Sequence, residues 1–249
     1  MTNRPEPQKL FSDSSVEEFS AEVFGIISSA LPLRSEQLFK SIDVNDASGV
    51  YVVSCRAPLY HGRGNRSIEE CQDQKESDLY GLSVTYKLQG DRSGKYLTVR
   101  YSNYSIRVHT QAAIRFEYER DKDRAPAAHI HFSGIGGLLS PALMKNGRTS
   151  KTDKRKDGDI SPLHVPVGGH RFRPSLEDFL YFVIQECGFT GKPGWEPKLK
   201  SSREKWFDIQ LQAAVRDNPL VAAKELRNLG FDVSEPEDKT FEPRRHSSW

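Results

Sequence analysis

Apolar residues recur along this chain at two spacings, and each spacing predicts one kind of element. Over residues 14–30 they recur every three to four positions, which is typical of an amphipathic helix. The acidic pair Glu17-Glu18 falls in the first turn, where the helix dipole favours negative charge, and Leu31-Pro32 ends the pattern. We therefore expect an N-terminal helix.

From residue 80 the spacing changes to two, because Tyr80, Leu82, Val84, Tyr86 and Leu88 alternate with polar or small residues. This alternation is typical of a strand with one buried face. Further strands are predicted, with turn residues between them, at 50–55, 95–108, 113–119 and 128–132. The 95–108 run fits either one long strand or two strands with a break near Ser102-Asn103. Short polar turns join most of these runs, so we expect an antiparallel meander.

The clearest helix signal lies at 175–187. Ser175 suits the N-cap, with Asp178 three residues later as in a capping box, and Gly188 marks the end. The residues of the expected apolar stripe are Leu176, Phe179, Leu180, Val183 and Cys187. Two further helices are expected at 200–216 and 220–229, separated by Asp217-Asn218-Pro219.

These elements predict an α+β fold with a mostly antiparallel sheet of four to six strands, an N-terminal helix, a core helix at 175–187 and a C-terminal helical pair. The predicted organisation is a flexible N-terminus at 1–12, a core domain at 13–190 with a basic loop at 140–160, a helical region at 191–233 and a disordered tail at 234–249.

Charge and cysteine content narrow the class of protein. The net charge is only +2, so any affinity for nucleic acid must be local rather than global. The three cysteines have no CxxC spacing, which argues against a disulfide framework and a zinc ribbon. Because no run of apolar residues is long enough to cross a membrane and no signal sequence is evident, we expect a cytoplasmic protein without a membrane partner.

Candidate chemistry first appears on the two strands at 113–119 and 128–132. If their apolar faces align in a hairpin, parity places one set of polar side chains on the opposite face. That set is Arg115, Glu117, Glu119, His129 and His131. Directly opposed Glu and His residues would be close enough to form an acid/base pair. The alternative is that this is simply the solvated face of a one-sided sheet.

A second candidate lies between these strands and the 175–187 helix, in the sequence LHVPVGGHRFR. The turn Gly168-Gly169, Arg171, Arg173 and the following helix N-terminus form a plausible phosphate site. The alternative is that both arginines are ordinary surface charges. The basic loop, with six basic residues and one acid between Lys145 and Lys156, is either a solvated loop or an arm that contacts phosphate.

A metal site is a further interpretation of the histidines. His129 and His131, with His164 or His170 as a third ligand, would leave a position open for a divalent metal's catalytic chemistry. The HIHF and PVGGH segments resemble the HxH and PxGxxH motifs of the cupins. Here PVGGH is one residue short, no Glu follows HIHF at the cupin distance, and a helix follows instead of more strands.

Two other resemblances bear on function. The Glu, His and Arg set is similar in chemistry to that of small microbial ribonucleases, without a shared local motif. The segments RFEYER, AHIHF, LHVPVGG and RPSLEDFLYF, spread over residues 80–190, resemble uncharacterised bacterial proteins of mobile-element and toxin–antitoxin type. That resemblance implies a toxin or phage-defence context and assigns no active-site residue.

The leading functional hypothesis is a nuclease that cleaves RNA, acting as the toxin of a toxin–antitoxin or phage-defence module. In it His129 and His131 are acid/base groups or metal ligands, Glu117 and Arg115 complete the catalytic set, and RNA and a cognate antitoxin are the expected partners. Two alternatives stay open: a non-enzymatic protein-binding module, and a metal-dependent hydrolase that uses the HxH motif.

Overall fold

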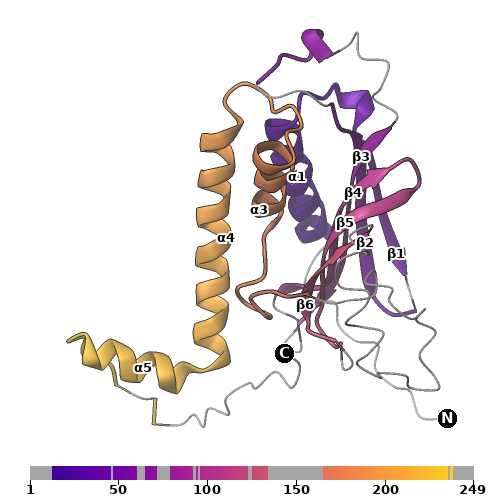
Figure 1. Ribbon diagram of the computed structural model, residues 1–249. Helices are drawn as coiled ribbons and strands as arrows, with labels where there is room; N and C mark the ends of the chain where they lie inside the picture. Colours follow the sequence, from indigo (N-terminus) through magenta and orange to yellow (C-terminus); the bar gives the residue numbers. More distant parts are fainter. Residues whose placement is uncertain are drawn as a thin grey trace, which may run out of the picture.

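A single antiparallel sheet of seven strands organises the molecule, and its strands lie in the order of the chain (Figure 1). The computed structural model describes residues 13–45, 47–60, 65–71, 79–91, 94, 96–122, 125–133, 165–234 and 236–237. The strands are β1 Phe39–Asn45, β2 Val50–Pro58, β3 Tyr80–Gly90, β4 Leu97–Val108, β5 Gln111–Glu119, β6 Ala128–Phe132 and β7 Val165–Pro166.

The described helices lie on one side of this sheet (Figure 1). They are α1 Asp13–Ala30, α3 Leu176–Tyr181, α4 Trp195–Asp217 and α5 Pro219–Asn228. Helices α1 and α3 cover the sheet, and α4 packs against both of them. A π-helical turn, Phe182–Glu186, continues α3, and 3-10 turns occupy Ser35–Gln37 and Glu69–Cys71. Helix α4 ends at Asp217, and Asn218 separates it from α5, which turns away from the sheet.

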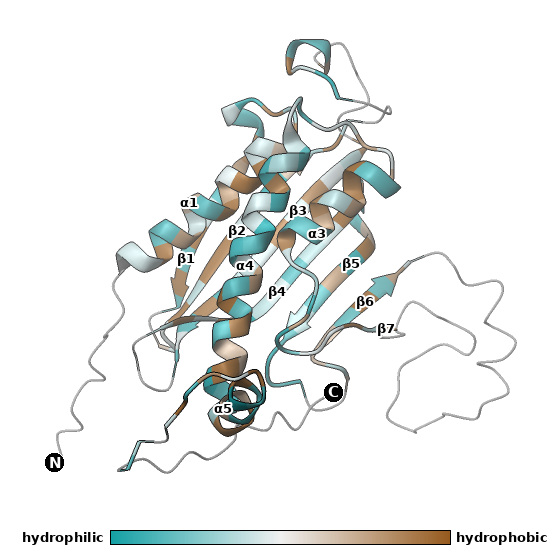
Figure 2. Ribbon diagram, turned by 90° about the vertical axis from the view of Figure 1, so that its left-hand side faces the viewer, coloured by the Kyte–Doolittle hydropathy of each residue, from teal (hydrophilic) through white to brown (hydrophobic). Residues whose placement is uncertain are grey.

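The core lies between the sheet and helices α1 and α3. On β2 and β3 every second side chain is buried, as expected of strands with one covered face. Phe179 of α3 is fully buried and its ring packs against Tyr104 and Phe116, at centroid distances of 5.8 and 5.0 Å. The buried residues of α1 and α3 are mostly apolar, while in Figure 2 the side of α4 that faces the viewer is mostly polar. The even-numbered residues of β5 therefore face the helices.

The predicted α+β class and antiparallel sheet are confirmed, and the sheet has seven strands rather than four to six. Strand β1 was not predicted because nearly all of its side chains are exposed, which removes the alternation of apolar and polar positions. Strand β7 is only two residues long. The run at 95–108 proves to be one strand, without a break at Ser102.

The core helix begins as predicted. Ser175 is its N-cap, and its side chain accepts a hydrogen bond from the backbone N–H of Asp178, whose carboxylate accepts one from the N–H of Ser175. Cys187 is exposed, which contradicts its place in the predicted apolar stripe. The π-helical turn inserts an extra residue into the helical repeat just before Cys187 and rotates that residue out of the stripe.

Several predictions concern residues outside the described part of the chain. These are the flexible N-terminus at 1–12, the basic loop at 140–160, His164 and the tail beyond residue 237. No helix among the described residues has both the length and the apolar character required to cross a membrane.

Candidate functional site

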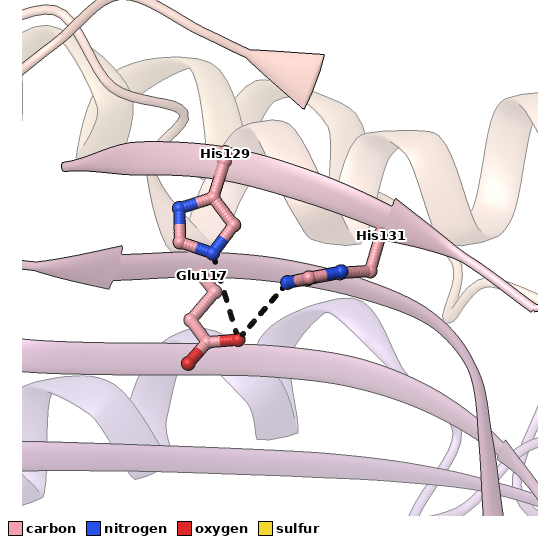
Figure 3. Close-up of side chains that lie close together, drawn as sticks. All are labelled: Glu117, His129 and His131. Atoms are coloured by element: carbon pink, nitrogen blue, oxygen red, sulfur yellow. Dashed lines mark ion pairs between the residues drawn. The ribbon is translucent and has the colours of Figure 1, made fainter. Parts of the chain in front are cut away.

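The polar cluster predicted on β5 and β6 is present. In the register of this strand pair, His129 stands directly opposite Glu117, and His131 stands opposite Arg115. The intervening residues Phe116 and Ile130 point toward the helices, so the cluster lies on the other face of the sheet. Figure 3 shows both imidazole rings directed at the Glu117 carboxylate.

The three side chains converge closely enough to share one ion. Oε2 of Glu117 lies 3.8 Å from Nε2 of His129 and 3.6 Å from Nε2 of His131. One ligand atom from each residue can be chosen so that all three atoms lie within 4.8 Å of one another. The exposed fraction of the side chain is 12% for Glu117, 8% for His131 and 0% for His129. All three side chains are therefore largely buried, with Glu117 the most exposed and His129 fully enclosed.

A backbone contact fixes the orientation of His129. Its Nδ1 lies 2.7 Å from the carbonyl oxygen of Pro126. A carbonyl can only accept a hydrogen bond, so Nδ1 carries a proton. In the neutral ring Nε2 then presents its lone pair toward the Glu117 carboxylate. Two acceptors facing each other are stabilised by a proton or a cation between them, which is what an acid/base site or a metal site provides.

Strand β4 adds a tyrosine that the sequence analysis did not find. Tyr101 and Asn103 lie on the same face, since Asn103 pairs with Glu117 and Tyr101 with Glu119. Burial raises the pKa of the Tyr101 phenol, and its hydrogen bond with Glu117 raises it as well. The Asn103 amide donates to the Tyr101 hydroxyl at 3.1 Å. Tyr101 is therefore a neutral hydrogen-bond donor beside the Glu117 carboxylate.

Positive charge on this face comes from two strands. Arg115 lies beside Glu117 on β5, close enough for its charge to lower the pKa of Tyr101. Lys87 of β3 pairs with Tyr101, and its ammonium lies 5.2 Å from the centre of that ring. Around Glu117 the face thus combines two imidazoles, a phenol and two cations with this carboxylate, and Glu119 is a second carboxylate on the same face.

The second predicted site lies mainly on the other face of the sheet, although Arg173 lines a small pocket together with Glu117 and His129. Arg171 donates two hydrogen bonds to Asp217 of α4, at 2.6 and 2.9 Å. Arg173 is buried with its guanidinium carbon 4.1 Å from the ring centre of Tyr118, a residue on the helix-covered face. Gly168 and Gly169 both have positive φ, at 59° and 60°, and form the turn that carries Arg171 and Arg173 there. The phosphate group expected at these four residues would lie across the sheet from His131.

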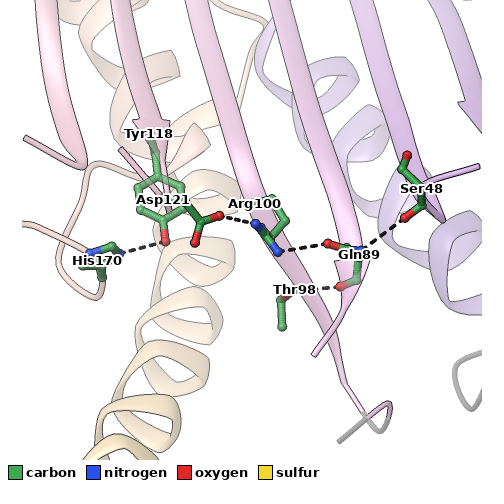
Figure 4. Close-up of polar contacts among 7 residues, drawn as sticks. All are labelled: Ser48, Gln89, Thr98, Arg100, Tyr118, Asp121 and His170. Atoms are coloured by element: carbon green, nitrogen blue, oxygen red, sulfur yellow. Dashed lines mark hydrogen bonds and ion pairs between the residues drawn. The ribbon is translucent and has the colours of Figure 1, made fainter. Parts of the chain in front are cut away.

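His170 belongs to the same turn rather than to the histidine cluster. Its Nδ1 lies 3.1 Å from the hydroxyl of Tyr118, as Figure 4 shows. Within the described part of the chain, the third donor beside His129 and His131 is therefore Glu117 and not His170.

Searches of protein-family models, of curated proteins and of solved structures each found no match.

Proposed function

We propose that the polar face of β4, β5 and β6 is the active site of a nuclease that cleaves phosphodiester bonds in RNA. The observation that carries the proposal is the position of the Glu117 carboxylate within 4 Å of both imidazoles, with Arg115 and Tyr101 on the same face. A carboxylate base, an imidazole acid and nearby cations are the groups that phosphodiester cleavage needs.

The role proposed for each residue follows from the exposed fraction of its side chain. Glu117 would remove the proton from a ribose 2′-hydroxyl, and the resulting oxygen would attack the adjacent phosphorus. His131, in its protonated form, would give its proton to the departing 5′-oxygen, so that the products are a 2′,3′-cyclic phosphate and a free 5′-hydroxyl. Arg115 and the Tyr101 phenol would stabilise the negative charge that develops on the phosphate oxygens. His129, which has no exposed side-chain surface, acts as a positioning residue that orients Glu117.

A metal-dependent hydrolase is the second candidate, and the hydrogen bond from His129 Nδ1 to the Pro126 carbonyl favours it. Histidines that bind metals usually donate their other N–H in this way, and two imidazoles with one carboxylate form a common catalytic donor set. Glu117, His129 and His131 would hold the ion, which would lower the pKa of a bound water.

Purified protein incubated with a defined RNA tests both candidates. We expect cleavage that leaves 2′,3′-cyclic phosphate ends, and loss of at least about a hundredfold in rate in Glu117→Gln and His131→Gln. Glu119→Gln is the matched control, because Glu119 is a carboxylate on the same face of β5 that pairs with Lys122 instead. His109→Asn is the control for the imidazole, since His109 is exposed in the β4–β5 turn.

The chemical groups at the ends of the RNA products and the effect of a chelator distinguish the metal-free nuclease from the metal-dependent hydrolase. Activity that persists in excess chelator supports the metal-free route, and activity lost and restored by added Zn²⁺ or Mn²⁺ supports the metal route. Intact RNA under all conditions, with a folded wild type, would overturn the nuclease proposal.

We further propose a cytoplasmic, toxin-like role with an antitoxin as partner, in keeping with the sequence resemblance. Induced expression of the wild type beside His131→Gln tests it through growth and the integrity of total RNA. A harmless wild type would overturn this cellular role without affecting the biochemical test.

A further inference from the structure

A cavity of about 440 Å³ lies on the helix-covered side of the sheet, between α1, α3, α4 and strands β3 and β4. Pockets that bind small molecules typically measure about 300–1,000 Å³. Part of its wall is apolar, contributed by Phe19, Val23 and Trp206, and part is charged, contributed by Arg120, Arg173 and Glu177. This cavity and the polar face lie on opposite faces of the sheet.

Arg173 places a positive charge in the wall of this cavity. Only 8% of the residue is exposed, and its guanidinium is stacked on Tyr118 with the Trp206 ring 5.8 Å away. One guanidinium nitrogen, NH1, donates to the carbonyl of His170 and, at 3.5 Å, to Oε1 of Gln210. Among the described residues no carboxylate forms an ion pair with Arg173. An arginine keeps its charge even when buried, so this charge has no direct counter-ion in the described protein.

Arg120 adds a second guanidinium to the same wall. Its Nε is buried and has no hydrogen-bond partner among the described residues. Burial is the main cause that lowers the pKa of Arg173, and the positive charge of Arg120 in the same wall lowers it further. A buried donor without a partner and two adjacent like charges are both unfavourable, and one anion between them would relieve both.

Two acidic residues of the wall, Asp217 and Glu177, are hydrogen-bonded to other groups. Asp217 accepts both hydrogen bonds of Arg171, and Glu177 accepts one from the hydroxyl of Ser202 at 2.5 Å. The hydroxyls of Tyr86 and Tyr104 are bonded to each other at 2.9 Å. Among the described residues, the buried polar atom of this wall that lacks a hydrogen-bond partner is Nε of Arg120, a cationic donor.

We propose that this cavity binds a small organic anion, an aromatic body that carries one carboxylate or phosphate group. The anionic group lies between Arg120 and Arg173, and the ring packs against Phe19, Val23 and Trp206. This assignment does not depend on nuclease activity, since no residue of the cavity wall belongs to the Glu117, His129 and His131 cluster.

Titration calorimetry with three probes of one shape tests the proposal: 1-naphthoate, 1-naphthyl phosphate and the neutral 1-naphthalenemethanol. We expect at least one of the two anions to bind about tenfold or more tightly than the alcohol, because charge-assisted hydrogen bonds are the stronger kind. The anion that binds better identifies the preferred group. Arg120→Gln is expected to reduce the affinity for the anion to that for the alcohol, while Arg107→Gln, an arginine of β4 outside the cavity wall, leaves it unchanged.

A competition on the wild type needs no variant and decides the matter if Arg120→Gln does not fold. Inorganic phosphate is expected to weaken the apparent binding of the anion without weakening that of the alcohol. Equal binding of all three probes, no binding at millimolar concentration, or competition that does not distinguish anion from alcohol would each overturn the proposal.

Discussion

Glu117 and His129 stand directly opposite each other on β5 and β6, with Oε2 of the first 3.8 Å from Nε2 of the second. This separation is too long for a direct hydrogen bond and suits an ion bound between the two atoms. The hydrogen bond from Nδ1 of His129 to the Pro126 carbonyl, just before β6, fixes the orientation of the ring.

If Glu117, His129 and His131 hold a divalent ion, adding Zn²⁺ will raise the unfolding temperature of the protein. At a concentration one hundred times the dissociation constant the expected gain is about 2.7 kcal/mol. Glu117→Gln removes one ligand and is expected to weaken binding at least about tenfold, whereas Glu119→Gln leaves it unchanged. Thermal unfolding with and without Zn²⁺ measures both effects. An equal response of the two variants would remove Glu117 from the donor set.

The neighbouring glycines Gly168 and Gly169 offer a test of the turn that carries Arg171 and Arg173. Both have positive φ, so either alanine substitution costs about 1–2 kcal/mol in backbone strain. At Gly168 a Cβ would also lie 1.8 Å from the carbonyl oxygen of Phe172, while at Gly169 it would meet nothing within 4 Å. We expect Gly168→Ala to lower the free energy of unfolding in urea markedly more than Gly169→Ala. Equal losses would contradict this turn geometry.

Truncation of the Phe179 side chain should lower the free energy of unfolding strongly. It is fully buried and packs against Tyr104 and Phe116. Phe179→Ala is expected to lower the free energy of unfolding by about 3–5 kcal/mol. Phe172→Ala deletes the same side chain at a site that is 62% exposed, and should change it by less than about 0.5 kcal/mol. Urea denaturation of the two variants beside the wild type checks the difference, and a small effect at Phe179 would place the core elsewhere.

Burial of Cys55 makes the protein less stable in alkali. Burial raises the pKa of its thiol to about 12, against about 8.5 for an ordinary cysteine. Between these values the native state keeps a proton that the unfolded state has lost, so the free energy of unfolding falls as pH rises, by about 1.4 kcal/mol per pH unit. The buried phenols of Tyr86 and Tyr104, whose pKa values are also raised by burial, add to this fall above about pH 10.

Urea denaturation at several pH values from 8 to 10 measures that slope. Cys55→Ala is expected to flatten it, because the titrating group is gone. Val53→Ala leaves a cavity on the same face of β2 without removing an ionisable group, so its slope should match the wild type. Identical slopes in all three proteins would show that Cys55 does not titrate in this range.

The sequence predicts the residues that β5 and β6 contribute to the site but not those of β4, because only the β5–β6 register can be inferred from it. The β5–β6 pairing follows from aligning two apolar faces, and parity alone then places Glu117, His129 and His131 together. Strand β4 could not be aligned in this way. Its register with β5 shifts by one residue at a bulge next to Arg107, which leaves Ala113 as the extra residue.

Without that bulge, the two-residue turn would pair Glu117 with Ser102 instead of Asn103, and Tyr101 would point toward the helices. A one-residue shift reverses the face of every side chain, and nothing in the sequence marks where it occurs. The local motif around Arg171 and Arg173 failed to predict their partners for a related reason. Proximity in sequence to the histidine strand does not fix which face of the sheet a turn returns to, and here it returns to the face of Tyr118.

The strand order has a consequence for how the molecule forms. Because each strand pairs with the strand that precedes it in the chain, every sheet contact closes a comparatively short loop, and the sheet can extend from β1 one strand at a time during synthesis. Helix α1 is made first and can cover the early strands, whereas α3 and α4 emerge only after β6. The polar face spans β4 to β6, so a nascent chain would acquire most of its sheet before it acquired either histidine of the cluster.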